Sequence, residues 1–309
     1  MIDLFCLGEP LVEFNQQKDG RFLRGFGGDV SNVAIAAARQ GAKSAMLSRI
    51  GQDRFDDDLR KLWQEEGVID EFVLTSTDSE TGIYFVTHGE YGHSFTYRRK
   101  GSAASKFKPN NLPRKAIANS KILYASGISL AISNSMCAAV KVAAETIRKA
   151  GRIFAFDPNL RTKLWSLDQA RRITHDVMVS CNIALPSLDD AKQLTGLSQP
   201  DQIVAFYHDL GASEVVITLG RDGVLASDGS LQRYIDPIEV TAIDATGAGD
   251  CFNGAYLAGR LRDLSTFEAA EWANVAAALS TFGLGAVTSI PTLTQTQKHI
   301  QQTGGYNVY

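Results

Sequence analysis

A heptapeptide with an acid at each end, DATGAGD, occupies Asp244 to Asp250 and leads directly into the apolar stretch FNGAYLAGRL. The apolar stretch is typical of a helix, and the first backbone amides of a helix have no partners within it. Glycine lacks the side chain that would keep a ligand away from those amides. We therefore predict that Gly247, Ala248 and Gly249 form an anion hole at a helix N-terminus, where partial positive charge gathers.

The last residue of this loop, Asp250, would repel a resting anion, so its presence requires another reason. In phosphoryl transfer the attacking hydroxyl loses a proton as it reaches phosphorus, and a carboxylate beside phosphate-holding amides is placed to accept that proton. The loop therefore indicates phosphoryl transfer with Asp250 as the base. The alternative is structural, in which Asp250 only stabilises the helix dipole and Asp244 caps a turn.

Two other phosphate-binding motifs fit this sequence less well. A dinucleotide-binding turn, GxGxxG, would use Gly247 and Gly249, but its third glycine position is Phe252. A P-loop, GxxxxGK followed by Ser or Thr, does not occur in the sequence. A Rossmann dehydrogenase and a P-loop enzyme are both disfavoured.

The overall composition narrows the possible partners. The chain has 309 residues, 44% of them hydrophobic, and 31 basic against 34 acidic residues give a net charge of -3. This balance provides no basic field, so neither nucleic acid nor a membrane surface is an expected partner. No apolar run reaches the roughly 20 residues of a membrane helix, and the start MIDLFCLGEP lacks a basic leader. Four dispersed cysteines without a CxxC pair favour free thiols and a cytoplasmic location.

Short β-branched or aromatic runs alternate with segments of helical periodicity along most of the chain. This alternation is typical of an α/β fold, in which helices cover both faces of a mostly parallel sheet. The runs are LFCLG, SAMLSRIG, KILYASG, RIFAFDPN, NIALPS and EVVITLG. The clearest helix is the alanine-rich segment Asp29 to Gln40, which Asp29 or Ser31 could cap and Gly41 could end.

A different pattern interrupts this alternation between residues 72 and 107. TGIYFVTHG and HSFTYRR alternate in polarity and are joined by a glycine-containing turn around Glu90 to Gly92, which predicts an antiparallel hairpin. Together with residues 11–25 the hairpin is expected to form a small sheet beside the main one, as an insertion in a single domain of residues 1–309. The exposed edge of such a sheet would favour a homodimer or a higher homo-oligomer.

Both ends of the chain resemble the signatures of the ribokinase-like (PfkB) carbohydrate kinases. DATGAGDCFNGAYLAGRL is similar to the C-terminal signature, and FGGDVSNVAIAAARQGAKSAMLSRIGQDRFDDDL is similar to the N-terminal one. The resemblance implies a ribokinase-like α/β core with a small β-sheet lid over a sugar, with ATP and Mg²⁺ as cofactors. It also implies that Asp250 is the catalytic base and that the amides of residues 247–249 hold the transferring phosphoryl group.

The resemblance further implies three groups of binding residues. The sugar would be contacted from the start of the alanine-rich helix by Gly28, Asp29 and Asn32. The nucleotide would lie against Thr218, Gly220, Gly223 and Asn274. A monovalent cation such as K⁺ would be surrounded by Asp244, Thr246, Gly285, Ala286 and Ser289.

One departure from the family pattern concerns magnesium. Many members carry an Asn-x-x-Glu motif that orders the water shell of Mg²⁺, and this chain has PSLDD, with Ser187 in place of the amide and a carboxylate at Asp190. The resemblance then implies a magnesium-ordering role for Asp190 and a position beside the nucleotide for Ser187. Taken alone, PSLDD is also typical of a helix cap.

The substrate class is indicated by arginines. In SFTYRRKGSAAS, strand alternation places Phe95, Tyr97 and Arg99 on one face. A neutral sugar gains little from arginine, whereas the planar guanidinium binds the carboxylate of a sugar acid at two points. Arg161, in FDPNLRTKLW just after a strand, is a second candidate. The alternative for either arginine is a solvated surface position.

Five strings resemble the 2-keto-3-deoxygluconate kinase branch of the family: TGIYFV, FTYRRKGSAAS, SGISLAIS, NLRTKLW and LPSLDD. This resemblance implies ATP-dependent phosphorylation of a sugar acid at its terminal hydroxyl, giving 2-keto-3-deoxy-6-phosphogluconate. It places Tyr84, Tyr97, Arg99 and Arg161 around the substrate. Two alternatives remain, a neutral-sugar kinase of the fructokinase or ribokinase type and a non-catalytic sugar-binding regulator on the same fold. Asp250 disfavours the regulator, because binding alone requires no base.

Overall fold

The computed structural model describes residues 1–89 and 92–303, and the turn predicted around Glu90 lies outside the described residues. The large sheet contains β1 (Leu4–Leu7), β4 (Ser44–Gly51), β5 (Val73–Ser76), β8 (Ile122–Ser126), β9 (Ile153–Asp157), β10 (Ile183–Ala184), β11 (Glu214–Thr218), β12 (Val224–Ser227) and β13 (Gln232–Ile235). The small sheet contains β2 (Leu11–Gln16), β3 (Phe22–Gly27), β6 (Ile83–Gly89) and β7 (Gly92–Arg98). The α-helices are α1 (Asp29–Arg39), α2 (Arg54–Glu65), α3 (Arg114–Asn119), α4 (Gly127–Ala131), α5 (Asn134–Lys149), α6 (Leu167–Met178), α7 (Leu188–Thr195), α8 (Pro200–Leu210), α9 (Ala248–Leu261), α10 (Thr266–Ser280) and α11 (Leu293–Thr303).

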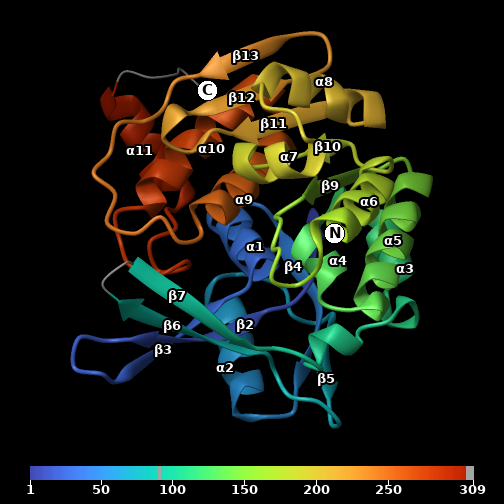
Figure 1. Cartoon of the computed structure of the whole chain (residues 1–309), viewed down its shortest axis with the longest axis vertical. Coiled ribbons are helices and arrows are strands. Elements are labelled where there is room, and N and C mark those ends of the chain that lie inside the picture. Colours follow the sequence, from blue (N-terminus) through green and yellow to red (C-terminus); the bar gives the residue numbers. More distant parts are fainter. Residues whose placement is uncertain (90–91, 304–309) are drawn as a thin grey trace.

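The large sheet has the order β13-β12-β11-β10-β9-β8-β1-β4-β5, and the small sheet has the order β3-β2-β6-β7 (Figure 1). From β11 to β5 all neighbouring strands are parallel, while β12 and β13 are antiparallel. All six runs identified in the sequence form strands of this parallel region. The predicted α/β class is therefore confirmed, together with the small additional sheet.

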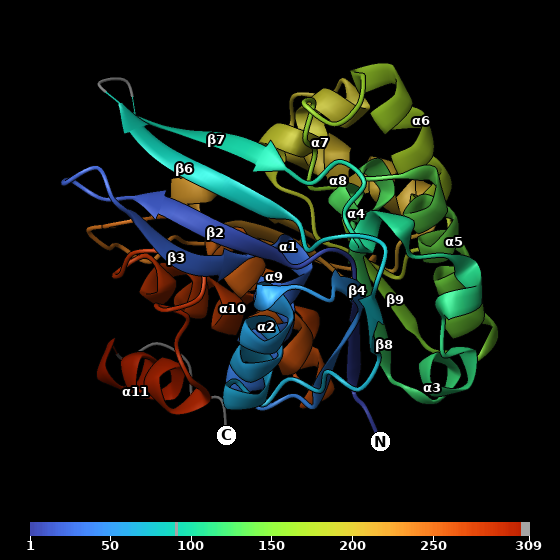
Figure 2. The ribbon, with the colours of Figure 1, turned by 90° about the horizontal axis from the view of Figure 1, so that it is seen from below.

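Strand β1 shows how the sequence produces a core on each face of the large sheet. Its four side chains are fully buried, and successive side chains of a strand point to opposite faces. Leu4 and Cys6 pack in the core formed with α1, α2, α9 and α10, whereas Phe5 and Leu7 pack in the core formed with α3 to α8. Figure 2 shows these two helical layers on either side of the sheet.

The first helix begins at Asp29, as predicted, but its cap differs from the prediction. Gly28 is the N-cap of α1, with φ 98°, and no side chain caps the helix. A Cβ at this position would lie 2.5 Å from the carbonyl oxygen of Glu9, so only glycine fits. Ser31 instead accepts a hydrogen bond from Trp63, and Asp29 accepts one from Asn159. Both candidate caps are engaged in tertiary contacts that sequence periodicity does not reveal.

Close packing of α1 against α9 brings the N-termini of these two helices together. A Cβ at Gly254 of α9 would lie 2.5 Å from the Cβ of Ala36 and 2.6 Å from the carbonyl oxygen of Val33. The helix axes can approach this closely because glycine faces the alanine-rich side of α1. Asp29, at the start of α1, and Asp250, in the first turn of α9, consequently belong to one site.

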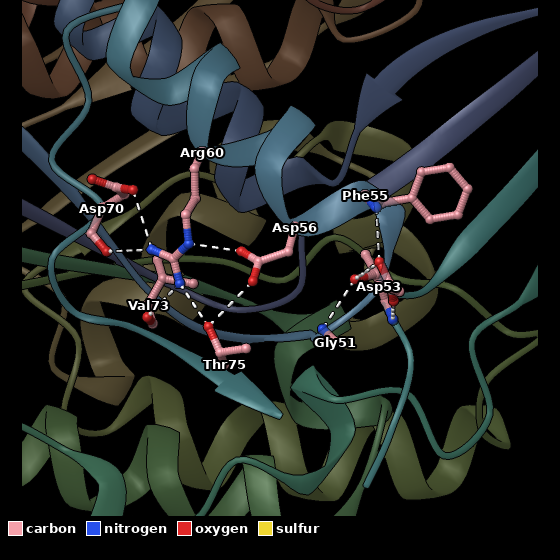
Figure 3. A network of polar contacts seen from close by, with 9 residues as sticks. Gly51, Asp53, Phe55, Asp56, Arg60, Asp70, Val73 and Thr75 are labelled. Atoms are coloured by element: carbon pink, nitrogen blue, oxygen red, sulfur yellow. Dashed lines mark hydrogen bonds and ion pairs between the residues drawn. The ribbon is translucent and has the colours of Figure 1, made fainter. Parts of the chain in front are cut away.

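The segment 72–107 is predicted to belong to the small sheet, but only part of it does. Its first strand, β5, pairs in parallel with β4 at the edge of the large sheet. Arg60 of α2 secures this strand by donating to the carbonyl of Val73 and to Thr75, 3.0 Å each, and to the carboxylate of Asp70, 3.1 Å (Figure 3). Asp56 in turn accepts from Arg60 at 2.7 Å. Side chains of the neighbouring helix α2 thus help to hold β5 in its place beside β4.

The four cysteines are free thiols, and three of them are buried. Burial raises the pKa of Cys251 to about 12, so this thiol is protonated at neutral pH. The prediction of free thiols is confirmed. Within residues 1–89 and 92–303, no helix combines the length and apolar character needed to cross a membrane.

Candidate active site

A cavity of about 450 Å³ lies where the small sheet meets the N-termini of α1 and α9. In Figure 2 the strands of the small sheet cross over these two helices. The structure brings many of the predicted residues to the wall of this cavity: Gly28, Asp29, Asn32, Tyr84, Tyr97, Arg99, Arg161, Thr246, Gly247, Asp250 and Ala286. Segments from distant parts of the chain therefore converge on one site.

Several lining residues were missed by the sequence analysis: Leu11, Ile128, Leu160, Thr162, Lys163 and Leu164. Four of them belong to the loop that follows the carboxyl end of β9. Ligands of α/β folds bind outside the carboxyl ends of parallel strands, so the position of this loop after a predicted strand was a usable signal. Lys163 is the most important omission because it adds a second cation beside Arg161.

The glycine-rich loop forms the predicted turn into α9. Gly247 is the N-cap with φ 76°, and Asp250 lies in the first helical turn. The N–H of Ala248 donates to the carbonyl of Ala245 at 3.2 Å, whereas the N–H groups of Gly247 and Gly249 have no hydrogen-bond partner among the described residues. The amides available to an anion are consequently fewer than predicted, because Ala248 completes the turn.

Exchange of the two loop glycines for alanine should destabilise the fold at Gly247 but not at Gly249. In Gly247→Ala, the new Cβ would lie 2.8 Å from that of Ala286, and the positive φ disfavours any side chain. We expect the free energy of unfolding to fall by about 1 to 3 kcal/mol. Gly249→Ala is the matched control, because nothing lies within 4 Å of its Cβ and φ is not positive. Urea unfolding measures both variants, and equal losses would contradict this account.

Asp244 connects this loop to the segment that follows α10. Its Oδ1 accepts from the N–H of Thr246 and its Oδ2 from the N–H of Gly285, both at 2.9 Å. Asp244 therefore caps the turn, as the structural alternative proposed. Ser289 donates to the carbonyl of Gly285 at 3.3 Å and faces a separate hollow beside α11, so it does not line the cavity.

The carboxylate of Asp250 is held by one neighbour and perturbed by others. Its Oδ2 accepts a hydrogen bond from Asn32 Nδ2 at 2.8 Å. Burial, followed by the negative charge of Asp29, raises the pKa of Asp250 to about 7, against the smaller lowering effects of Asn32 and Arg161. A group whose pKa lies near neutrality can exchange protons at physiological pH. This property goes beyond what stabilising a helix dipole requires.

The two predicted arginines are in different electrostatic situations. Arg99 donates through Nε to the buried carboxylate of Glu9 at 2.6 Å, and Nη2 forms an ion pair with the same group. Its charge is therefore already balanced. Arg161 is exposed, and its guanidinium hydrogen bond is to the carbonyl of Leu160 at 2.8 Å. Neither Arg161 nor Lys163 has a carboxylate ion-pair partner among the described residues.

Aromatic residues of the small sheet form the opposite wall. Tyr84 stacks on Tyr97 with ring centroids 5.7 Å apart, and the Arg99 guanidinium lies 5.6 Å from the Tyr97 centroid. The hydroxyl of Tyr84 donates to Glu13, which is buried. Both tyrosines line the cavity, where their rings supply apolar surface.

The residues predicted to bind the nucleotide lie together, but outside the cavity lining. Thr218 at the end of β11 forms an isolated bridge with Ser187, and Gly220 and Gly223 follow it in the next loop. At Gly223, with φ 91°, a Cβ would lie 2.1 Å from the carbonyl oxygen of Ile235, so the turn requires glycine. The side-chain amide of Asn274 donates to the carbonyl of Asp236 at 2.8 Å.

The acid predicted to order magnesium water connects two segments. Ser187 caps α7 by accepting from the N–H of Asp190 at 3.3 Å, which confirms PSLDD as a helix cap. The Oδ2 of Asp190 accepts from the N–H of Leu160 at 3.1 Å, and burial raises its pKa. Among the described residues, no group of three or more His, Cys, Asp or Glu side chains is arranged to hold a metal ion.

Comparisons with known proteins agree with this geometry. A 2-dehydro-3-deoxygluconokinase of Thermoproteus tenax is 32% identical over 291 residues, which is 90% of this chain and 88% of the relative. A probable fructokinase-4 of Arabidopsis thaliana is 30% identical over 312 residues, 95% of each chain. A solved structure of a putative ribokinase II from E. coli in complex with ATP and Mg²⁺ superposes with a TM-score of 0.90 and 26% identity, covering 98% of this chain and all of the other.

These similarities extend over both sheets and both helical layers, so the fold is ribokinase-like. The pfkB carbohydrate kinase family matches residues 1–293, a range that includes the glycine-rich loop, the small sheet and the cavity between them. The chain belongs to the pfkB family of carbohydrate kinases.

Proposed function

We propose that this kinase uses ATP to phosphorylate 2-keto-3-deoxygluconate at its terminal hydroxyl, giving 2-keto-3-deoxy-6-phosphogluconate. The main support is that one cavity contains the Asp250 carboxylate, Gly247 of the glycine loop with its available amide, and the exposed cations Arg161 and Lys163. The carboxylate and the amide suit phosphoryl transfer to a hydroxyl. The cations suit a substrate that carries a carboxylate. The named activity of the Thermoproteus tenax relative agrees with this assignment.

In this proposal Asp250 accepts the proton of the substrate hydroxyl as the hydroxyl attacks the γ-phosphate. Asn32 occupies Oδ2, so the proton would go to Oδ1. Backbone amides at the N-terminus of α9 stabilise charge on the transferred group. Closure of the small sheet over the cavity would exclude water and align the hydroxyl with the phosphate.

The sugar hydroxyls are assigned to the start of α1. Asn32 Oδ1 is buried and has no hydrogen-bond partner among the described residues, so it can accept from a hydroxyl of the ligand. Asp29 lines the same wall, and Gly28 allows the sugar to approach the backbone. Tyr84 and Tyr97 would pack against the carbon chain of the substrate.

ATP is assigned to the loop after β11, with its adenine toward Asn274 and its phosphates toward α9. Mg²⁺, which neutralises phosphate charge when bound, prefers carboxylates, water and phosphate oxygens. The donor set fits this preference, because Asp190 supplies a carboxylate, whose Oδ2 accepts from the N–H of Leu160. For K⁺, the resemblance assigns Asp244, Thr246 and Gly285; these residues already form one hydrogen-bonded turn.

The proposed function is tested by a coupled assay of ADP release with a panel of 2-keto-3-deoxy acids, ketoses and aldoses. The highest kcat/KM is expected for a 2-keto-3-deoxy sugar acid. A neutral-sugar kinase is the second candidate, because Glu9 already balances Arg99 and because the Arabidopsis relative is a probable fructokinase. A preference for fructose or ribose would establish this alternative. Sugar binding without ADP release would indicate a regulator.

The pH dependence of catalysis should follow Asp250. The base must be ionised, so kcat/KM should fall as the pH drops below the raised pKa of about 7. Because the charge of Asp29 is the second cause of this rise, after burial, Asp29→Asn should move the acid limb to lower pH. Profiles between about pH 5 and 9 for both proteins measure this shift. If the acid limb of the variant lies at the same pH as that of the wild type, the charge of Asp29 does not raise the pKa of Asp250.

Two further assignments concern the protein as a whole. We place it in the cytoplasm, where its free thiols would stay reduced.

We also propose a homodimer formed through the edge of the small sheet, where Leu23 of β3 is 62% exposed. Sedimentation equilibrium of the wild type and of Leu23→Lys should show a dimer and a weakened dimer; a monomeric wild type would exclude the proposal.

A further inference from the structure

Asn159, two residues after β9, has an unusual backbone conformation. Its φ is 32°, and among the described residues Asp263 is the other non-glycine with positive φ. Asparagine tolerates this region better than most residues, but the conformation is still unfavourable and persists only where surrounding structure enforces it. Asn159 is 6% exposed, so a solvent-exposed turn does not explain it.

Three elements enforce this conformation. The N–H of Asn159 donates to Asp157 Oδ1 at 2.8 Å, and Asp157 Oδ2 accepts from Asn253 Nδ2 of α9 at 2.8 Å. From α4, Gly127 makes room for the preceding carbonyl, since a Cβ there would lie 1.8 Å from the carbonyl oxygen of Pro158. The conformation is therefore determined by contacts with β9, α9 and α4.

The result of this conformation is one contact with the candidate active site. Asn159 Nδ2 donates to Asp29 Oδ2 at 3.1 Å, across 130 positions of the chain. The following residues, Leu160 and Arg161, then turn into the cavity lining. Asp29 does not cap α1, and among the described residues the amide of Asn159 is the side-chain donor to its carboxylate.

We propose that Asn159 is a positioning residue that orients the Asp29 carboxylate toward the hydroxyls of the sugar. This inference rests on the proposed sugar-binding role of Asp29. A fixed donor on Oδ2 leaves Oδ1 to accept from the substrate in one defined direction. Without the amide, the carboxylate would rotate and the substrate would have to order it on binding.

Two substitutions separate positioning from packing. Asn159→Gly keeps the positive φ accessible and removes the amide, so the sugar KM should rise by about tenfold, as for one hydrogen bond to a charged group. Asn159→Asp keeps the shape but places a carboxylate against Asp29, so its sugar KM should rise further. The KM for ATP should stay within about twofold in both variants.

If Asn159 served only in packing, the sugar KM would rise more in Asn159→Gly than in Asn159→Asp. Aspartate is nearly isosteric with asparagine, whereas glycine leaves a void. The inference is overturned if Asn159→Asp has the lower sugar KM, if the KM values for sugar and ATP rise together, or if neither changes. Asp263→Gly is the matched control for relieving a positive φ, since Asp263 is exposed after α9. Its kinetic constants should equal those of the wild type.

The same measurements distinguish failure of this inference from failure of the proposed function. The sugar KM is determined with whichever acceptor the wild type phosphorylates best in the substrate panel. If that acceptor is a ketose, the sugar-acid assignment fails, while the order of the two Asn159 variants still tests the positioning of Asp29. Thermal unfolding of both variants accompanies the kinetics, and Asn159→Gly serves if Asn159→Asp does not fold.

Discussion

Asp250→Asn is expected to lower kcat by about 10² to 10⁴-fold, the range of general-base assistance, while ATP still binds. An amide cannot accept the hydroxyl proton, but it can still accept the hydrogen bond from Asn32. Steady-state kinetics and calorimetric titration with ATP measure the two properties separately. Near-normal turnover would refute the role of Asp250 as base. Asp263→Asn, an exposed acid beyond the other end of α9, is the matched control and should remain fully active.

The same variant should be more stable than the wild type at pH 8. The pKa of Asp250 is raised from 3.8 to about 7 by burial and by Asp29, so the folded protein binds a proton more tightly than the unfolded chain. Stability of the wild type therefore falls as the pH rises between these values, and the penalty remains above them. The neutral amide avoids this penalty. Lower stability with lost activity would indicate misfolding instead of loss of the base.

Arg161→Gln is expected to raise the KM for a 2-keto-3-deoxy acid by about 30 to 100-fold, since a charge-assisted, bidentate contact to a carboxylate is lost. A neutral ketose has no such contact, so its KM should change by less than about threefold. Competition between the two substrates at fixed ATP measures the selectivity. Equal losses for both would favour the neutral-sugar kinase. Arg152→Gln, an exposed arginine next to the start of β9, is the control.

Arg99 is a less suitable position for this test. Removing its side chain would leave the buried carboxylate of Glu9 without its cation, which destabilises a protein by about 3 to 5 kcal/mol. Loss of activity in Arg99→Ala would thus combine misfolding with lost recognition. Arg99→Lys keeps the charge beside Glu9 and removes the planar fork, so it is the informative substitution. It should affect the sugar acid less than Arg161→Gln does.

Local patterns were sufficient to predict the architecture. Short β-branched or aromatic runs identified the parallel strands, because a strand buried on both faces of a sheet needs apolar side chains on both. The glycine loop was recognised because a positive φ at Gly247 and free amides before a helix depend on residues that are adjacent in sequence. The alternation of Tyr97 and Arg99 likewise placed them on one face, and both line the cavity.

Contacts between distant segments could not be predicted in this way. Arg60 of α2 donates to β5, Glu9 balances the charge of Arg99, and Asn159 donates to Asp29. The sequence by itself determined the fold class, the glycine turn that starts α9 and the candidate base, because backbone conformation and burial pattern are local properties. Only the tertiary structure decided which charges remain available to a ligand, since a side chain's electrostatic partner is selected by packing in three dimensions.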